Sequence, residues 1–594
     1  MQARTAPAMR SRQLPAAAAL LLVLLAAIFF AAIRYRLRDM PLERDEGEYA
    51  YSGQLLLQGI PPYKLAYNMK LPGTYVAYAV AMAAFGETSA GIHLGLLLLN
   101  AITVFLLYFL VSTLFDRLAA VAAACSYAAL STSQSVMGFE AHATNFVLLP
   151  ALAGILLLLS AAENRRGSAG DPPAVERTSR PLSGPLLLLS GFLSGIAFLM
   201  KQHGIFFILF CLFYLTWSAW ERKDSSQQIL FKAALFLLGA MLPYLISCWL
   251  LYRAGVFTQF WFWTVSYANE YSKMGLRRAI HAFGENLTTV VRPALPLWIL
   301  AAAGMSAPLW SQSARGCSVF VTGLFLFSFL SLCPGAYFRP HYFILLLPAI
   351  AILAGVAVSA TTEKLAQHFR AGPILLIPAL ALLASFSYAI FRQRQIYFFK
   401  SPVEAVQATY GGNAFVPALE IAGYIRNHSP ESARIAVIGS EPEICFYAHR
   451  HSATGYIYMY SLIGPQKYTS PMRAEFVREL EQNRPEFLVY VDIWDSWGER
   501  EGSPQAAGFL TWLQNYMGEN YERVGVADIR DTTEYVWGTL AGSYSPKSNK
   551  VIYVLKRKSV EIRRGALSRP FQPQSIVRAH AGNAMLKRTS SDLN

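Results

Sequence analysis

The chain has 594 residues, of which 54% are hydrophobic and only 15% are charged. A soluble protein carries about 25% charged residues, so this composition excludes an ordinary soluble protein and indicates an integral membrane protein. The formal net charge of +15 suits a protein that faces anionic or phosphorylated lipids, and it also suits the routine flanking of membrane spans by Lys and Arg. We expect no nucleic acid among its partners. The six cysteines form no CxxC pair, so neither a zinc site nor a disulfide framework is indicated.

The N-terminal region predicts a membrane anchor. Residues 14–33 form an apolar run of the length that crosses a bilayer core, about 20 residues. Signal-peptide cores are shorter, at about 7–15 residues, and end in a small-residue cleavage site, so we interpret the run as an uncleaved anchor. Residues 74–85 are apolar but too short to span, which predicts an interfacial or re-entrant helix.

Further apolar segments bring the expected number of spans to about eleven. They lie at about 90–113, 118–136, 143–162, 183–200, 204–220, 233–252, 293–310, 317–333, 342–360 and 373–391. Residues 163–180 are rich in Gly, Pro and Arg and predict a flexible loop. Residues 253–292 are rich in Trp, Phe and Tyr, which favour the membrane–water interface, and predict a long loop.

Alternating the sides from the first anchor puts several polar loops on one face, together with everything after residue 391. These loops are 34–89, 137–142, 201–203, 253–292 and 334–341. Lys and Arg occur on both faces, so the positive-inside rule does not orient the chain. Basic residues that stay on a translocated face need another role, and holding a phosphate is one.

The composition divides the chain into a membrane domain, residues 1–391, an α/β domain, residues 392–560, and a basic tail, residues 561–594. In the second domain, short β-branched or aromatic runs alternate with helical spacing, which predicts a small α/β layer domain. Strands are expected at 434–438, 487–491 and 551–555, and helices at 416–427 and 472–483. Ile438-Gly439-Ser440-Glu441 is too weak to indicate a nucleotide site. The tail is low in apolar residues and is expected to be disordered.

One acidic stretch, Arg44-Asp45-Glu46-Gly47-Glu48-Tyr49, follows the anchor. Transfer of a sugar to a hydroxyl needs a base near the attacking oxygen, and carboxylates also stabilise an oxocarbenium-like transition state. Neighbouring carboxylates equally suit a divalent cation, and the plain alternative is a solvated helix start. We interpret the stretch as the acid/base centre of a membrane enzyme that acts on a lipid-linked substrate.

Other ionisable residues fall on the same predicted face. Glu140 and His142 occupy a very short loop between two apolar helices, where ionisable groups are functional candidates. Their expected partners are Lys70, Lys201 or a metal held with Asp45, and a headgroup-level turn is the alternative.

Lys201 interrupts a nearly continuous apolar stretch and must snorkel or meet an anion. A lipid phosphate is the obvious anion, and Lys70 and Arg339 are placed to share it. For Arg339 and its neighbour His341, a helix end that faces headgroups is an equal alternative.

These motifs resemble the membrane glycosyltransferases of the GT-C fold, family 39-type, which include protein O-mannosyltransferase, the aminoarabinose transferase ArnT and RgtA-like proteins. The resemblance lies in Asp45-Glu46-Gly47-Glu48-Tyr49, in Lys70-Leu71-Pro72-Gly73 and in Phe85-Gly86, and it covers most of residues 14–391. Two departures are Lys-Leu-Pro in place of the family's Lys-Pro-Pro, and Glu140 where ArnT-like members often have Asp.

The resemblance implies an inverting transferase that moves a monosaccharide from a polyprenyl-phosphate donor to a lipid, glycan or protein acceptor. It implies a multi-pass protein of the bacterial inner membrane, with the site and the α/β domain on the periplasmic side. Asp45 takes the position of the catalytic base, and Glu46 and Glu140 complete the expected catalytic set. The expected substrate-binding residues are Glu48, Tyr49, Lys70, His142, Lys201, Arg339 and His341, and Asp45 with Glu140 would hold a divalent metal if one is used.

Two other functions fit the composition. A transporter or flippase for a lipid-linked sugar would place its ionisable residues near the bilayer midplane, often with internal repeats, and no repeat is visible. A membrane sensor with an external ligand-binding α/β domain is the third alternative.

Overall fold

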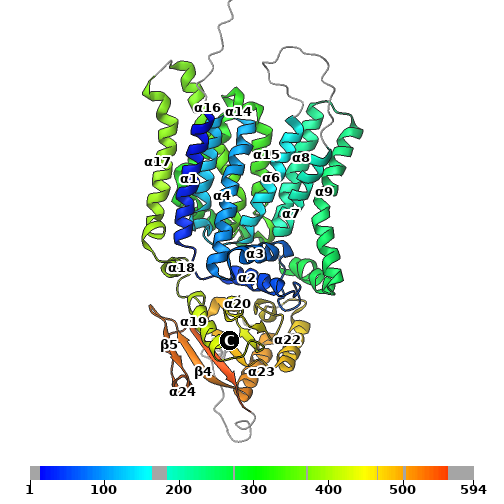
Figure 1. Ribbon diagram of the computed structural model, residues 1–594, viewed down its shortest axis with the longest axis vertical. Coiled ribbons are helices and arrows are strands. Elements are labelled where there is room, and N and C mark those ends of the chain that lie inside the picture. The colour runs from blue at the N-terminus through cyan, green and yellow to red at the C-terminus, as the bar shows by residue number, and fades with distance from the viewer. Residues whose placement is uncertain are drawn as a thin grey trace, which may run out of the picture.

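The computed structural model describes residues 14–163, 184–271, 275–369, 372–464, 466–498 and 504–559. A bundle of long helices forms one end of the molecule and a six-stranded sheet with its helices forms the other (Figure 1). The predicted fold class, a polytopic helical membrane protein with a C-terminal α/β part, is confirmed. The predicted tail at 561–594 lies outside the described residues, and so does the loop at 163–180 apart from residue 163.

Within the described ranges, eight helical segments are long and apolar enough to cross a membrane. They contain α1 (Ala16–Arg36), α4 (Ser89–Leu114), α6 (Ala143–Glu163), α8 (Ile205–Glu221), α9 (Ser226–Arg253), α12 with α13 (Leu276–Val291 and Leu295–Ser306), α16 (Leu347–His368) and α17 (Ile377–Arg394). Three predicted spans are shorter apolar helices, α5 (Arg117–Ser131), α7 (Gly184–Met200) and α15 (Ser318–Leu330). Helix length alone therefore does not fix the predicted count of eleven.

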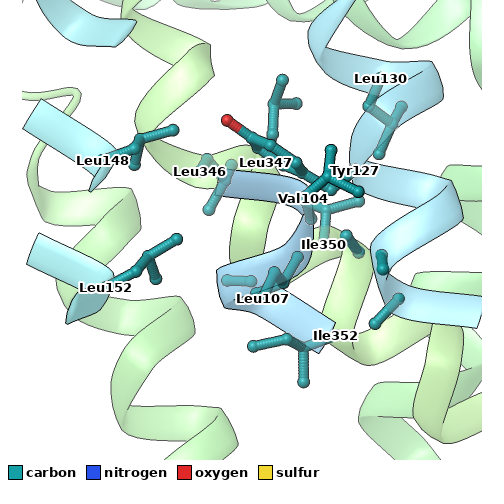
Figure 2. Packing of buried hydrophobic residues seen from close by; sticks show 14 of the residues in the cluster. Val104, Leu107, Tyr127, Leu130, Leu148, Leu152, Leu346, Leu347, Ile350 and Ile352 are labelled. Carbon is teal, nitrogen blue, oxygen red and sulfur yellow. The ribbon is translucent and has the colours of Figure 1, made fainter. Parts of the chain in front are cut away.

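The bundle is organised around α16. In the apolar segment Pro340–His368, which contains this helix, 94% of the most apolar 18 residues are buried. Figure 2 shows its Leu347, Ile350 and Ile352 packed among leucine and valine side chains of α4, α5 and α6. A helix that is apolar on all sides belongs in the interior of such a bundle. Several of the other long helices, among them α1, α9 and α17, present large apolar side chains outward, as lipid-facing helices do.

Two shorter helices lie across the end of the bundle that faces the sheet (Figure 1). They are α2 (Arg44–Leu57) and α3 (Pro72–Phe85). The orientation of α3 agrees with the interfacial helix predicted at 74–85. Its first turn contains Pro72, which is suited to a helix start because the missing N–H would have no partner there.

The prediction of a loop at 253–292 is wrong. The segment forms α10 (Phe257–Trp261), the π-helical turn η3 (Phe262–Tyr267), α11 (Ala268–Tyr271) and α12. Phe260, Trp263 and Tyr267 are buried and recur three or four residues apart, which is a helical spacing. The polar residues between them lowered the hydropathy on which the prediction relied.

The sheet has the order β2-β1-β3-β6-β4-β5, with the first three strands parallel and the remaining pairs antiparallel. Its strands are β1 (Arg434–Ile438), β2 (His451–Ser452), β3 (Phe487–Asp492), β4 (Tyr521–Asp528), β5 (Glu534–Trp537) and β6 (Val551–Arg557). The three predicted strands are confirmed as β1, β3 and β6. The predicted helices are confirmed as α19 (Phe415–Asn427) and α22 (Thr469–Asn483).

We call the part from α18 (Pro402–Tyr410) to β6 the sheet domain. Its remaining helices are α20 (Glu443–Ala448), α21 (Tyr460–Ile463), α23 (Pro504–Asn520) and α24 (Thr539–Ser543). Ile444 and Phe446 of α20 share one buried apolar cluster with Ala50 of α2 and Met82 of α3. The sheet domain is therefore joined to the end of the bundle by a continuous core.

Candidate active site

The helix α2 begins with a capping box formed by Glu43 and Glu46. The Glu43 carboxylate accepts a hydrogen bond from the Glu46 amide at 2.9 Å, and the Glu46 carboxylate accepts one from the Glu43 amide at 3.4 Å. Such a box satisfies amides that would otherwise lack partners at a helix start. Because successive residues of a helix point about 100° apart, the fixed first turn directs Arg44, Asp45 and Glu46 toward three different surroundings.

Glu46 is buried and saturated with partners. Its carboxylate lies 3.0 Å from Nε2 of His93 in α4 and accepts the amide of Ala141 at 2.6 Å. These bonds tie α2 to α4 and to the loop at 132–142. Glu46 was predicted as a catalytic acid; in the structure its carboxylate is bonded to His93 and to the amides of Glu43 and Ala141.

Glu48 is also fully buried. It accepts hydrogen bonds from the hydroxyl of Tyr75 at 2.7 Å and from that of Tyr458 at 3.2 Å. Burial, together with the charge of Asp45, raises the pKa of Glu48 to about 7 although Lys70 opposes the rise. Asp45, by contrast, keeps 18% of its side-chain exposure, so it is the acid of α2 that a substrate can reach.

Lys70 connects Asp45 to Tyr49. Its Nζ lies 3.6 Å from Oδ2 of Asp45 and donates to the Tyr49 hydroxyl at 2.9 Å, while Tyr63 donates to its carbonyl at 2.7 Å. Burial opposes the charge on Lys70, but Asp45 raises the pKa of this lysine well above its ordinary value. Burial likewise opposes the charge on Asp45, but Lys70 and Arg339 lower its pKa below the ordinary range. Both groups therefore stay ionised.

The loop at 132–142 is held in place by Arg34, near the end of α1. The guanidinium of Arg34 donates to the carbonyl of Ser131 at 2.7 Å and to that of Gly138. These carbonyls lie at the end of α5 and in the following loop, where helical partners are missing. Arg34 is thus one of the basic residues on this face whose task is to bind backbone rather than phosphate.

Glu140 lies behind the exposed part of the site. It is buried, with Oε1 at 3.1 Å from Nε2 of Gln134 and 3.4 Å from the Tyr410 hydroxyl. Burial and the charge of Glu46 raise the pKa of Glu140 to about 7. Oε2 of Glu140 has no hydrogen-bond partner among the described residues.

His142 and His341 meet beside Asp45. Their rings stack with centres 4.0 Å apart and planes inclined by 17°, and one ligand atom from each of the three residues lies within 4.8 Å of the others. Both ring nitrogens of His142 and Nδ1 of His341 are buried without a hydrogen-bond partner in the described structure. Burial lowers the pKa of His142 to about 4, which keeps its imidazole in the neutral form that binds metals.

These three residues fit a divalent cation, because two imidazoles and a carboxylate are common ligands of zinc and similar ions. The prediction that Asp45 and Glu140 would be the ligands needs correction. Glu140 is not in the set, since its carboxylate is turned toward Gln134 and Tyr410.

Two further cations act on Asp45. Lys201 is buried between α7 and α8, with Nζ 4.1 Å from the centre of the Tyr342 ring, and burial together with the charge of Lys70 lowers its pKa well below the ordinary value. Arg339 is exposed, and its charge is among those that lower the pKa of Asp45. Charges from three separate segments therefore act on one carboxylate, with Lys70 at 3.6 Å and Lys201 and Arg339 near enough to lower its pKa.

Several residues of the site were not predicted. His93 carried a usable signal, because an ionisable residue inside an apolar span is a functional candidate by default. Arg44 and Tyr458 carried none that points to their partners. Tyr458 lies 410 positions from Glu48, and no spacing rule reaches that far.

Comparisons with known proteins found a family model and solved structures that this chain is similar to. A family model described as dolichyl-phosphate-mannose-protein mannosyltransferase matches residues 71–171. ArnT from Cupriavidus metallidurans in the apo state is 15% identical, with 90% of this chain and 97% of that chain covered at a TM-score of 0.52. ArnT bound to undecaprenyl phosphate is 16% identical, with coverages of 80% and 94% and a TM-score of 0.51.

The archaeal oligosaccharyltransferase AglB from Archaeoglobus fulgidus, in complex with an inhibitory peptide and a dolichol-phosphate, is 14% identical. The alignment covers 92% of this chain and 76% of that chain, with a TM-score of 0.50. The chain has the GT-C fold. No curated protein matches the sequence.

In this GT-C protein α2, which contains Asp45, lies between the end of the bundle and the sheet domain (Figure 1). Chemically, the site can hold an anion with Lys70, Lys201 and Arg339. It can also present one ionised carboxylate, Asp45, to a group that gives up a proton or gains positive charge.

Proposed function

We propose that this GT-C protein is a glycosyltransferase that moves a monosaccharide from a polyprenyl-phosphate donor to a hydroxyl of a lipid, glycan or protein acceptor. The observation that carries the proposal is the position of Asp45, the partly exposed acid of α2, among Lys70, Lys201 and Arg339. The fold it shares with ArnT bound to undecaprenyl phosphate and with AglB bound to dolichol-phosphate supports it. So does the match to a mannosyltransferase family model.

The three cations bind the donor phosphate. In the reaction, the bond between the anomeric carbon and the phosphate oxygen breaks, and its electron pair stays on the phosphate. Lys70, Lys201 and Arg339 stabilise that developing charge, and arginine can bind two phosphate oxygens at once. Charge stabilisation of this kind in a water-poor site contributes roughly 2.7–4 kcal/mol per contact. For Lys201, a phosphate also supplies a second anion beside Asp45 to offset the cost of its burial.

Asp45 acts on the acceptor. Its low pKa keeps it ionised, so it receives the acceptor's proton as the new carbon–oxygen bond forms and the acceptor oxygen becomes acidic. It also faces the positive charge that builds up on the sugar. Glu46 and Glu48 are buried and bound by other groups. A site that presents a single carboxylate suits one direct displacement, which inverts the anomeric centre.

Asp45, His142 and His341 would hold a divalent cation if the enzyme uses one. Such an ion would add positive charge beside the phosphate oxygens. Tyr49 keeps Lys70 directed at Asp45, and Glu140 supports the loop that carries His142.

We propose that the protein lies in a bacterial inner membrane with the site and the sheet domain on the periplasmic side. The support is that both lie at one end of the bundle (Figure 1), where a lipid-linked donor exposes its sugar. A β-lactamase fused after the C-terminus should protect cells from ampicillin. A fusion that leaves cells sensitive while the protein is present in the membrane would reverse this orientation.

The deciding experiment uses purified protein in nanodiscs with undecaprenyl-phosphate donors that carry a radiolabelled sugar. Membranes from cells that lack the gene serve as the acceptor, and free undecaprenyl phosphate and labelled acceptor are both measured. We expect both products in equal amounts. A transporter would instead move intact donor across liposomes, and a sensor would do neither. The site residues lie at one end of the bundle, whereas transporters place theirs near the midplane.

Mass spectrometry of cell-envelope glycans with and without the gene would then identify the sugar and the acceptor.

A further inference from the structure

The parallel half of the sheet has the topology of an open α/β ligand-binding sheet. The strands β2, β1 and β3 are parallel in that order, so the chain passes to one side of β1 and returns to the other. Such sheets bind ligands in the crevice outside the carboxyl ends of the strands, at the point where the direction reverses. In this domain the crevice lies between the segment after β1, residues 439–443, and the segment after β3, residues 493–497.

Arg44 of α2 occupies this crevice. Its Nε donates to the carbonyl of Ser440 at 2.8 Å, and Nη2 lies 3.2 Å from Oε1 of Glu441. The guanidinium carbon lies 5.8 Å from the centre of the Phe415 ring and 5.6 Å from that of Tyr460. The place where a sheet of this type holds a ligand's polar group is therefore taken by a side chain of the membrane part.

The two segments are joined to each other so that they present Glu441 to Arg44. The Ser496 hydroxyl donates to Oε2 of Glu441 at 2.7 Å, and the Ser440 amide donates to the same oxygen at 2.6 Å. The Ser440 hydroxyl donates to the carbonyl of Ser496 at 2.6 Å. Glu441, Ser440 and Ser496 are fully buried. Because these bonds occupy Oε2, the other oxygen of the carboxylate is the one that meets Arg44.

The segments around β2 bind the same helix. The hydroxyl of Tyr458, after β2, lies 3.2 Å from Oε2 of Glu48 and 3.1 Å from the carbonyl of Arg44. On the neighbouring side, Gly47 touches α20, because a Cβ at this position would lie 2.7 Å from the Cβ and the amide nitrogen of Glu443. The segments that follow β1 and β2 thus contact the first two turns of α2, and the segment that follows β3 holds Glu441 in place through Ser496.

We infer that the sheet domain is a positioning element for the transfer reaction, in which Arg44 and Tyr458 fix the first turn of α2 and so the direction of the Asp45 carboxylate. The inference rests on the proposed function of Asp45. Arg44 and Asp45 are adjacent in the chain but point to opposite partners, the sheet domain and Lys70. Arg44 is therefore a positioning residue. A displacement of a reacting group by about 1 Å lowers a rate by about a hundredfold, so its loss affects turnover more than donor binding.

The test compares Arg44→Met, Arg44→Lys and Tyr458→Phe in the full-length protein in nanodiscs. Arg38→Met is the matched control, since Arg38 lies before α2, pairs with exposed Asp39 and donates to the nearby carbonyl of Tyr35. Three quantities are measured: the kcat and donor KM of transfer, the Kd for undecaprenyl phosphate, and hydrogen exchange of the amides in α2 and in residues 439–443 and 493–497.

We expect Arg44→Met to lower kcat ten- to a hundredfold while the Kd for undecaprenyl phosphate changes less than about twofold. Amide exchange should rise in α2 and in both segments, Arg44→Lys should recover part of the rate, and Arg38→Met should match wild type. Wild-type kcat together with unchanged exchange in Arg44→Met would overturn the inference.

Tyr458→Phe removes one oxygen and keeps the ring, so this variant tests the inference if Arg44→Met does not fold. It should lower kcat severalfold and raise exchange at the start of α2, and a wild-type result in both measurements would also overturn the inference. If the wild type transfers no sugar from any donor, the proposed function fails. The exchange data then still decide whether Arg44 couples the two parts.

Discussion

The ammonium of Lys70 lies 3.6 Å from the carboxylate of Asp45, and the same ammonium donates to Tyr49 at 2.9 Å. Lys70 precedes α3 and Asp45 begins α2, so the pair joins the two helices that lie across the end of the bundle. Each charge offsets the cost of burying the other. The pair can open toward a phosphate on one side and a hydroxyl on the other, which is the arrangement that transfer between two substrates requires.

Asp45→Asn should reduce sugar transfer by at least about a hundredfold, because a placed acid/base group contributes about 10²–10⁴-fold. The change keeps the shape of the side chain and removes its charge. Transfer from a radiolabelled undecaprenyl-phosphate sugar measures the effect, and the melting temperature in detergent reports folding. Asp39→Asn is the control, since Asp39 lies in the segment before α2 with its side chain 57% exposed. Near-normal transfer by Asp45→Asn would remove Asp45 from the mechanism.

Lys201→Met should have opposite effects on stability and on donor binding. Lys201 is buried, and its Nζ lies 4.1 Å from the centre of the Tyr342 ring. Replacing a buried charge by an apolar side chain of similar length is commonly neutral or stabilising, so the melting temperature should hold or rise. A charge-assisted hydrogen bond contributes about 1.5–3 kcal/mol, so the Kd for undecaprenyl phosphate should rise about 10- to 100-fold. Lys223→Met, on the predicted opposite face, is the control. An unchanged Kd would exclude Lys201 from phosphate binding.

Glu48 should make stability depend on pH. Its pKa is raised to about 7 from the ordinary 4.5, chiefly by burial. A carboxyl whose pKa is raised in the folded state stabilises the fold below its unfolded pKa, and that contribution is lost as pH rises through 7. The loss amounts to about 3 kcal/mol, at about 1.36 kcal/mol per pKa unit.

The melting temperature of wild type should therefore fall relative to Glu48→Gln between pH 4.5 and 7, and the difference should level off above that range. The control is Glu522→Gln, which changes an exposed acid of β4. Its melting temperature should depend on pH in the same way as that of wild type. Parallel curves for wild type and Glu48→Gln would show that the buried carboxyl does not titrate in this range.

The sequence predicted the membrane class, the α/β part and the residues around Asp45, because each has a local signal. Apolar runs mark the spans, β-branched runs mark β1, β3 and β6, and charges between apolar segments mark Lys70, Glu140 and Lys201. The helices at 257–271 and 276–291 were missed because their buried aromatics are separated by polar residues. β2 was missed because it has two residues, too few for a pattern.

The different roles of the three acids of α2 could not be predicted. Asp45, Glu46 and Glu48 look alike as a sequence, and their roles differ because His93, Ala141, Tyr75 and Tyr458 come from distant segments. The same holds for the metal set. His341 joins Asp45 and His142 through tertiary packing, in which η7 (Pro340–Leu346) lies against α6 and η1.

Purified protein should bind a divalent cation through Asp45, His142 and His341. Three buried ring nitrogens of the two histidines lack hydrogen-bond partners in the described structure, and neutral imidazoles bind zinc-like ions well. Isothermal titration with zinc should show one site in wild type and at least about a tenfold weaker site in His341→Gln. His449→Gln, a histidine of the sheet domain, is the control. Equal zinc affinity in all three proteins would rule out this site.

Gly47→Ala should lower activity although it adds no charge and favours the helix. Alanine in place of a helical glycine normally stabilises by about 1 kcal/mol. At Gly47, however, the new Cβ would lie 2.7 Å from the Cβ and the amide nitrogen of Glu443, so α2 and α20 must move apart. Because that movement displaces Asp45, we expect kcat to fall about tenfold or more, with little change in the Kd for undecaprenyl phosphate. Gly423→Ala is the matched control, since Gly423 lies inside α19 with open space around its Cβ position, and it should raise the melting temperature slightly. If both alanine variants behave alike, the contact between α2 and α20 does not govern the position of Asp45.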